Sequence, residues 1–114
     1  MFPSPRQRFA NLLLQALQRG DARAVHLEAR TRGKTVTLGL DENGTWVPLL
    51  RLTGGSAACN VMSLDVRHGK GWAPTGERGT PEMLAEPLLG PLSFTWMIEV
   101  DAVVDWRQTS DQGH

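Results

Sequence analysis

The sequence predicts an α+β domain: a curved, mainly antiparallel sheet of five strands with an N-terminal helix packed on one face. Three observations support this class. A helical signature opens the chain, several segments then alternate apolar and polar residues, and short glycine-containing turns join those segments. The predicted order is helix, four strands, a short second helix and a last strand, because short hairpin connections make successive strands antiparallel neighbours.

The bulk composition is that of one globular domain. The chain has 114 residues, of which 40% are hydrophobic and 21% are charged, a balance typical of folded rather than disordered chains. We expect a single domain over 1–107 and a frayed polar tail over 108–114. Cys59 is the one cysteine, and no run approaches the roughly 20 apolar residues of a membrane helix. We therefore expect a cytoplasmic protein with no membrane partner.

The first predicted element is a helix that begins near Ser4. Ser4, Pro5 and Gln7 have the residue types and spacing of an N-cap, a first helical proline and a capping-box glutamine. One apolar face with helical spacing follows, and Gly20 stands where a left-handed C-terminal cap is expected. The predicted buried face consists of Phe9, Leu12, Leu13, Ala16 and Leu17.

Two strands are predicted next, over 23–30 and 34–40. Each alternates apolar and polar residues with a period of two, as half-buried strands do. The residues that join them include Gly33, which a tight hairpin needs. A second hairpin turn is predicted at Asn43-Gly44, one of the strongest short-range turn signals.

The third predicted strand, 45–52, is apolar on both parities. Pro48 cannot donate a hydrogen bond to a neighbouring strand, so we expect this strand to be an edge, bulged or broken there. Its second apolar face needs a cover, either the N-terminal helix or a second copy of the chain. A fourth strand is predicted over 57–67, with Ser63, Asp65 and Arg67 facing outward.

A short helix and a long strand complete the prediction. Thr80-Pro81 repeats the helix-start chemistry of the N-terminus, and Pro87 limits this second helix to one or two turns. The last strand is predicted over 92–106, because one parity is unbroken in its apolar character. That parity comprises Leu92, Phe94, Trp96, Ile98, Val100, Ala102, Val104 and Trp106.

A loop is expected over 67–81, with four glycines, two prolines and three permanent cations. Glycine-rich backbone can turn its N–H groups toward an anion, and a tryptophan can stack on a base. The segment lacks the spacing of a phosphate loop or a dinucleotide-binding fingerprint. The alternative is a flexible loop whose tryptophan packs onto the core. The candidate ligand- or anion-binding residues are Arg67, His68, Lys70, Trp72, Arg78 and Thr80.

Catalytic and metal chemistry are poorly supported. The three histidines lack metal-ligand spacing, and Cys59 has no base and orienting group placed beside it by the pattern. Carboxylates on the predicted last strand are typical of a solvated face. They are Glu99, Asp101 and Asp105. We therefore predict no catalytic residue, no metal site and no cofactor.

The sequence favours a small non-enzymatic binding or assembly module that forms a homodimer through strands 45–52 and 92–106. The two halves of the chain also carry opposite net charge, which can orient self-association. The candidate interface residues are Trp46, Leu49, Trp96 and Trp106. Another protein is a further possible partner. The alternative is binding of nucleic acid or another polyanion through 67–81, weighed against a formal net charge of zero.

Overall fold

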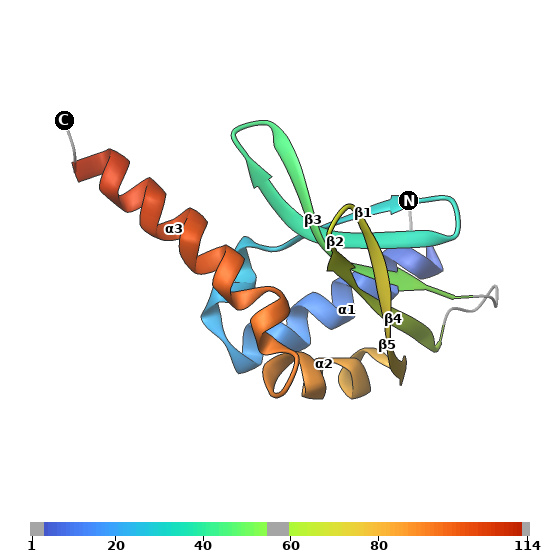
Figure 1. Ribbon diagram of the computed structural model, residues 1–114. Helices are drawn as coiled ribbons and strands as arrows, with labels where there is room; N and C mark the ends of the chain where they lie inside the picture. Colours follow the sequence, from blue (N-terminus) through green and yellow to red (C-terminus); the bar gives the residue numbers. More distant parts are fainter. Residues whose placement is uncertain (1–3, 55–59, 113–114) are drawn as a thin grey trace.

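Helices cover one side of a five-stranded sheet (Figure 1). The computed structural model describes residues 4–54 and 60–112, with side chains described as far as Val104. The helical elements are α1 (Pro5–Gly20), the 3-10 turn η1 (Ala22–His26), α2 (Pro81–Leu89), η2 (Ser93–Thr95) and α3 (Met97–Gln112). The strands are β1 (Glu28–Arg32), β2 (Thr35–Glu42), β3 (Thr45–Thr53), β4 (Met62–His68) and β5 (Gly71–Gly79).

The sheet is an antiparallel meander in which the strands lie in sequence order, β1-β2-β3-β4-β5. The predicted α+β class is therefore confirmed. The first two hairpin turns also form where glycine predicts them: Gly33 has a φ of 59°, and Asn43 and Gly44 have φ values of 55° and 87°. Positive φ at both central residues suits a two-residue turn, because it matches the twist of the flanking strands.

Helix α1 begins as the sequence predicts. The Ser4 side chain accepts a hydrogen bond from the Gln7 backbone N–H at 3.2 Å, and Pro5 opens the helix. Leu12, predicted to be buried, is 41% exposed. Helix α1 ends at Gly20, but the C-cap is Asp21 in an extended conformation, so Gly20 is not the expected left-handed cap. Gly20 has a packing role instead, because a Cβ there would overlap the Leu89 side chain of α2.

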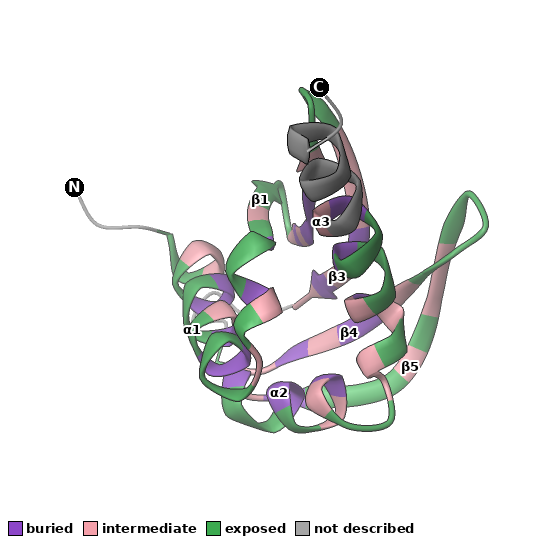
Figure 2. Cartoon of the chain, turned by 90° about the vertical axis from the view of Figure 1, so that its left-hand side faces the viewer, coloured by how far each residue is buried: buried purple, intermediate pink, exposed green. Residues whose placement is uncertain are grey.

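The core lies between the sheet and the pair α1 and α2 (Figure 2). We call the sheet face under these helices the inner face. Trp96, which follows η2, is fully buried, and its indole Nε1–H donates to the Leu88 carbonyl oxygen at 2.8 Å. A buried indole needs such a partner, so this bond fixes the chain between α2 and α3. The helical residues buried in the core are Phe9, Ala10, Leu13, Ala16, Leu17, Ala24, Leu84, Ala85, Leu88, Val100 and Val103.

A β-bulge interrupts the pairing of β2 with β3. Leu38 pairs with Leu50, but the next residue, Gly39, pairs with Pro48, so Leu49 is the extra residue. Leu49 and Leu50 are both buried as a result. Of the three alternatives expected at Pro48, an edge, a bulge or a break, the structure shows a bulge, which explains why consecutive apolar residues of this strand are both buried in the core.

The segment 67–81 is a β-hairpin followed by the start of α2, so the prediction of a loop there was wrong. Arg67 pairs with Trp72 and His68 pairs with Gly71, across a two-residue turn in which Gly69 has a φ of 59°. The many glycines and prolines in this segment conceal a strand signal. An irregular register between Ser63 and Asp65 accommodates the extra residues of β5.

The segment 92–106 is not a strand, so the fifth strand is β5 and the predicted element order is corrected. Trp96, Val100 and Val103 are buried in it, a spacing of four and three residues that places them on one face of a helix. The apolar residues of this segment satisfy both periods, and only packing decides between them. Helix α3 continues through Gln112, into the segment expected as a polar tail.

The predicted strand 23–30 is also only partly correct. Its first half forms η1, and β1 begins at Glu28. The Asp21 side chain accepts a hydrogen bond from the Arg23 backbone N–H at 2.9 Å, which favours a helical turn over an extended chain. Among the described helices, none is long and apolar enough to cross a bilayer.

Candidate functional site

The sheet face opposite the core, here called the outer face, carries the polar chemistry of the protein. All five arginines of the strands belong to it, because each alternates with residues of the inner face. These arginines are Arg30, Arg32, Arg51, Arg67 and Arg78. Two tryptophans share the face with them: Trp46 pairs with Asp41 in the sheet, and Trp72 pairs with Arg67.

Two rows of side chains cross the outer face in register. The first row runs from Arg30 through Thr37 and Arg51 to Asp65, each the pairing partner of the next. The second row runs from Arg32 across all five strands to Arg78. Its middle members are Thr35, Thr53 and Ser63. Neighbours within a row stand about 4.8 Å apart, the spacing of adjacent strands.

The first row is largely neutralised by ion pairs. Arg51 donates from Nε and Nη2 to Oδ2 of Asp65, at 3.0 and 2.8 Å, and Asp65 is only 8% exposed. Arg30 Nη2 lies 3.4 Å from Oδ2 of Asp41 at a more exposed position. A carboxylate as enclosed as Asp65 needs such a partner, so this row serves structure first.

Arginines cover both tryptophan rings. The Arg30 guanidinium carbon lies 4.1 Å from the Trp46 ring centroid, while those of Arg51 and Arg67 lie 5.2 and 5.4 Å from that of Trp72. Trp72 is half-buried on the outer face and does not turn into the core. Guanidinium and indole planes together provide a cationic stacking surface.

Five cations of this face have no carboxylate within 4 Å among the residues that the structure describes. They are Arg32, Lys34, Arg67, Lys70 and Arg78, all exposed. Arg67 Nε donates to the Gly69 carbonyl oxygen at 3.1 Å, which steadies its side chain beside the β4–β5 turn. The positive charge of the outer face is therefore available to a ligand.

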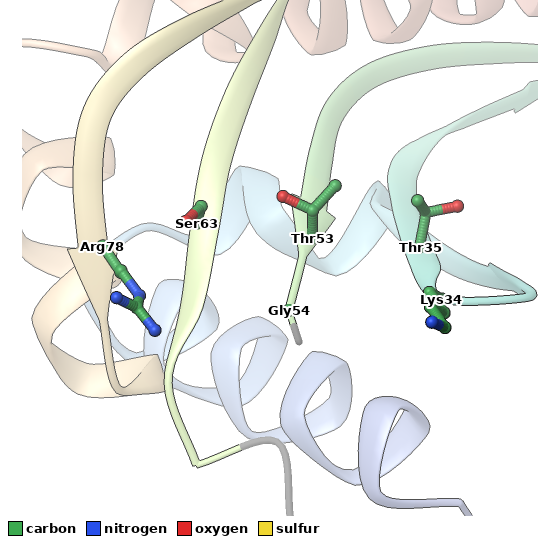
Figure 3. Close-up of a pocket in the computed structure, with 6 residues that line it drawn as sticks. All are labelled: Lys34, Thr35, Thr53, Gly54, Ser63 and Arg78. Atoms are coloured by element: carbon green, nitrogen blue, oxygen red, sulfur yellow. The ribbon is translucent and has the colours of Figure 1, made fainter. Parts of the chain in front are cut away.

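A pocket of about 350 Å³ lies on the second row, at the end of the sheet where β3 ends and β4 begins (Figure 3). The hydroxyl residues Thr53 and Ser63 lie between Arg78 on one side and Lys34 on the other. Thr35 Oγ1 donates to the Arg32 carbonyl oxygen at 2.9 Å. We call this site the hydroxyl pocket, lined by Lys34, Thr35, Thr53, Gly54, Ser63 and Arg78.

The six residues predicted to bind an anion do not converge. Arg67, His68, Lys70 and Trp72 surround the β4–β5 turn, whereas Arg78 pairs with Ser63 near the opposite end of β4. Arg67 and Ser63 are four residues apart on β4, about 13 Å. Thr80 has a structural role, since its Oγ1 accepts a hydrogen bond from the Met83 backbone N–H at 3.3 Å and caps α2.

Of the residues that line the hydroxyl pocket, sequence reasoning chose Arg78 alone and missed Lys34, Thr35, Thr53, Gly54 and Ser63. Thr35 and Ser63 lie on the polar parity of predicted strands, which was the available signal. The alternation shows that these residues face outward, but which of them share a row depends on pairing between distant segments.

The four predicted interface residues differ in exposure. Leu49 and Trp96 are buried inside this chain, at 4% and 0% exposure, so their apolar character is explained by the core. Trp46 is half-buried beneath Arg30 on the outer face. The side chain of Trp106 lies outside the described residues, as does Cys59.

Away from the sheet, an ion-pair cluster links η1 to α3. The Arg23 side chain donates to both carboxylate oxygens of Asp21, at 2.9 and 2.8 Å, and Nη1 donates to Asp101 Oδ2 at 2.8 Å. These bonds lower the pKa of Asp21 to about 2 and raise the pKa of Arg23. Asp101 is thus used in a structural pair. Over residues 4–54 and 60–112, no group of three or more potential metal ligands is found.

The outer face thus combines unpaired cations, arginine-covered indoles and a row of hydroxyls. No protein-family model, curated protein or solved structure gives a significant match to this chain. Its function has to be argued from the chemistry of the site, because fold class does not determine activity.

Proposed function

We propose that this protein is a non-enzymatic binding module that holds single-stranded nucleic acid on the outer face of its sheet. The observation that carries the proposal is the placement of all five strand arginines on that one face, with unpaired cations at both ends of β4 and β5. Lys and Arg side chains that neutralise phosphates supply most of the affinity in such complexes.

The aromatic residues favour a single strand over a duplex. Trp46 and Trp72 offer ring surfaces beside Arg30 and Arg67. Unpaired bases can stack on such aromatic and guanidinium planes, whereas bases inside a duplex are not available to them. The hydroxyls of the second row add hydrogen-bond donors for phosphate oxygens.

The experiment is a fluorescence anisotropy titration of a labelled single-stranded oligonucleotide over a series of salt concentrations. In the double variant Arg67→Ala/Arg78→Ala, we expect weaker binding and a slope of log affinity against log salt that is smaller by about 1.4, from about 0.7 for each lost phosphate contact. Intrinsic fluorescence should change on binding in the wild type, and less so in Trp72→Phe.

A matched control is Arg8→Ala/Arg19→Ala, which removes the same charge from exposed positions of α1. This control should bind like the wild type. Equal losses in both double variants would mean that total charge, not the outer face, governs binding. Failure of the wild type to bind at low salt, or binding of polyphosphate in preference to any oligonucleotide, would reject the nucleic-acid assignment.

Self-association is a second candidate function, through residues other than those predicted from the sequence. The bulge removes the reason for pairing through β3, but Phe94 and Ile98 are each 62% exposed where α3 begins. Phe94 belongs to η2 and Ile98 to the first turn of α3, four residues apart, and α3 extends away from the body of the protein (Figure 1). Exposed aromatic and aliphatic side chains are common interface anchors.

Light scattering tests this second candidate. A dimer that dissociates in the Phe94→Ser/Ile98→Ser variant would support it. The control is Leu12→Ser, because Leu12 is 41% exposed on α1, away from the contact between η1 and α3. A wild-type monomer at high protein concentration would exclude a dimer.

A further inference from the structure

The hydroxyl pocket has the composition of an anion site. Its lining offers two cationic side chains, Lys34 and Arg78, and three hydroxyl groups. Within the described part of the chain, the hydroxyls of Thr53 and Ser63 make no hydrogen bond with another group. Their donors are therefore available, and both residues are half-buried, where a hydrogen bond to an anion is worth more than in open water.

The charge balance of the pocket favours a dianion. Lys34 and Arg78 contribute two positive charges, and Arg32 stands at the end of the same row. The nearest carboxylate along β4 is Asp65, two residues from Ser63, and Arg51 neutralises it at 2.8 Å. A phosphomonoester carries about two negative charges at neutral pH, whereas each phosphodiester within a strand carries one.

The position of the pocket favours binding of the end of a nucleic-acid strand over binding of its middle. The arginine-covered Trp72 lies toward the β4–β5 turn, and the pocket lies about 13 Å away along β4, where the sheet ends. A single-stranded nucleic acid that stacks on Trp72 and follows the outer face would therefore reach the pocket at the end of the sheet. A volume of about 350 Å³ is at the small end for ligand pockets, enough for a phosphate and its sugar.

We propose that the hydroxyl pocket is a subsite for a terminal phosphate, a phosphomonoester, of the nucleic acid bound on the outer face. This inference rests on the proposed function. Arg78 and Lys34 hold the charge of the phosphate, and Thr53 and Ser63 donate hydrogen bonds to its oxygens. Arg67 and Lys70, at the other end of the hairpin, contact internal phosphates without distinguishing the ends.

The test compares three oligonucleotides of one sequence, with a 5′-phosphate, a 3′-phosphate or hydroxyls at both ends, in competition with a labelled strand. We expect the wild type to prefer one phosphorylated form by about tenfold. The preference should disappear in Arg78→Gln and in Thr53→Val/Ser63→Ala, and inorganic phosphate should reduce it. In Lys70→Ala, all three strands should bind more weakly and the preference should remain.

The outcomes separate the two proposals. Equal affinity of the wild type for all three strands overturns the terminal-phosphate subsite and leaves nucleic-acid binding in place. Binding of none of them overturns both. A preference that survives in Arg78→Gln and in Thr53→Val/Ser63→Ala places the phosphate elsewhere and also overturns the subsite. Because Arg78 is exposed, Arg78→Gln should fold, and circular dichroism with thermal unfolding checks every variant.

Discussion

On the inner face of the sheet, Leu50 and Leu64 are almost fully enclosed beneath the helices, at 0% and 1% exposure. Their immediate neighbours on the outer face, Arg51 and Asp65, pair with each other and belong to a row of charged and hydroxyl side chains. The same two strands therefore supply stability on one side and potential binding on the other. Because side chains alternate along a strand, substitutions can change one property with little effect on the other.

The largest loss of stability should come from the inner side of the sheet. Trp96→Ala removes the largest fully buried side chain that the structure describes, together with its bond to the Leu88 carbonyl oxygen, and we expect about 3–5 kcal/mol lower free energy of unfolding. Urea denaturation measures this. Trp46→Ala, on the outer face, should cost about 1 kcal/mol, the contribution of its exposed contact with Arg30. Similar losses of stability in Trp96→Ala and Trp46→Ala would contradict the division between a stabilising inner side and a binding outer face.

Asp65→Asn tests the boundary between the two faces, because Asp65 faces outward yet is nearly buried. Loss of its charge removes the two hydrogen bonds from Arg51 in their ionic form, and we expect about 1.5–3 kcal/mol lower stability. The released Arg51 should also strengthen oligonucleotide binding. The control Asp41→Asn, at the more exposed pair with Arg30, keeps an amide oxygen that can accept the hydrogen bond from the Gly44 backbone N–H, and should cost less than about 1 kcal/mol. Equal stabilities of Asp65→Asn and Asp41→Asn would mean that burial of Asp65 does not increase the contribution of its ion pair to stability.

Gly39→Ala tests the bulge that turns Leu49 toward the core. A Cβ at this position would overlap the Val47 carbonyl oxygen and approach the Pro48 Cα to 2.9 Å. These are backbone atoms that cannot rotate away, so we expect about 1–3 kcal/mol lower stability by thermal or urea unfolding. Gly71→Ala is the matched control, since its Cβ would lie 3.9 Å from the His68 carbonyl oxygen, an ordinary van der Waals contact. Unchanged stability in Gly39→Ala would mean that the bulge can move.

The smallest expected effect lies outside both faces, at the ion pairs between η1 and α3. The pKa of Asp21 is about 2 in the folded protein, because Arg23 binds its carboxylate, and about 3.9 in an unfolded chain. Folding stability from this pair is therefore present above about pH 4 and lost as the pH falls toward 2. Urea unfolding from pH 5 to pH 2 should show a shallower decline in Asp21→Asn than in the wild type. Parallel declines would exclude a contribution from Asp21.

The sequence predicts those elements whose signals are local. The N-cap of α1, the hairpin turn at Asn43-Gly44 and the bulge at Pro48 depend on residues a few positions apart. The two main errors, over 67–81 and 92–106, concern segments where local signals conflict. Glycines and prolines conceal β5, and the apolar residues around Trp96 fit a strand or a helix until α2 and the core decide.

For the candidate site, as for the fold, the sequence indicates only those residues whose signal is local. Arg67, Trp72 and Arg78 could be chosen from the sequence, because an unusual concentration of cations and an indole mark one segment. The hydroxyl pocket could not, because Thr35, Thr53 and Ser63 come from three strands and meet only through the register of the sheet. Register depends on contacts between segments that are remote in sequence.

The meander order of the strands has a consequence for how the protein folds. Each strand pairs only with its neighbour in the chain, so the sheet can assemble from local hairpins at a small cost in loop-closure entropy. The contact between α1 and α2 is different, since it joins residues more than sixty positions apart along the chain, such as Gly20 and Leu89. We therefore expect the sheet to form early and the α1–α2 layer to close late. Truncation of Leu84 should then accelerate unfolding while leaving the folding rate nearly unchanged, as stopped-flow kinetics can measure.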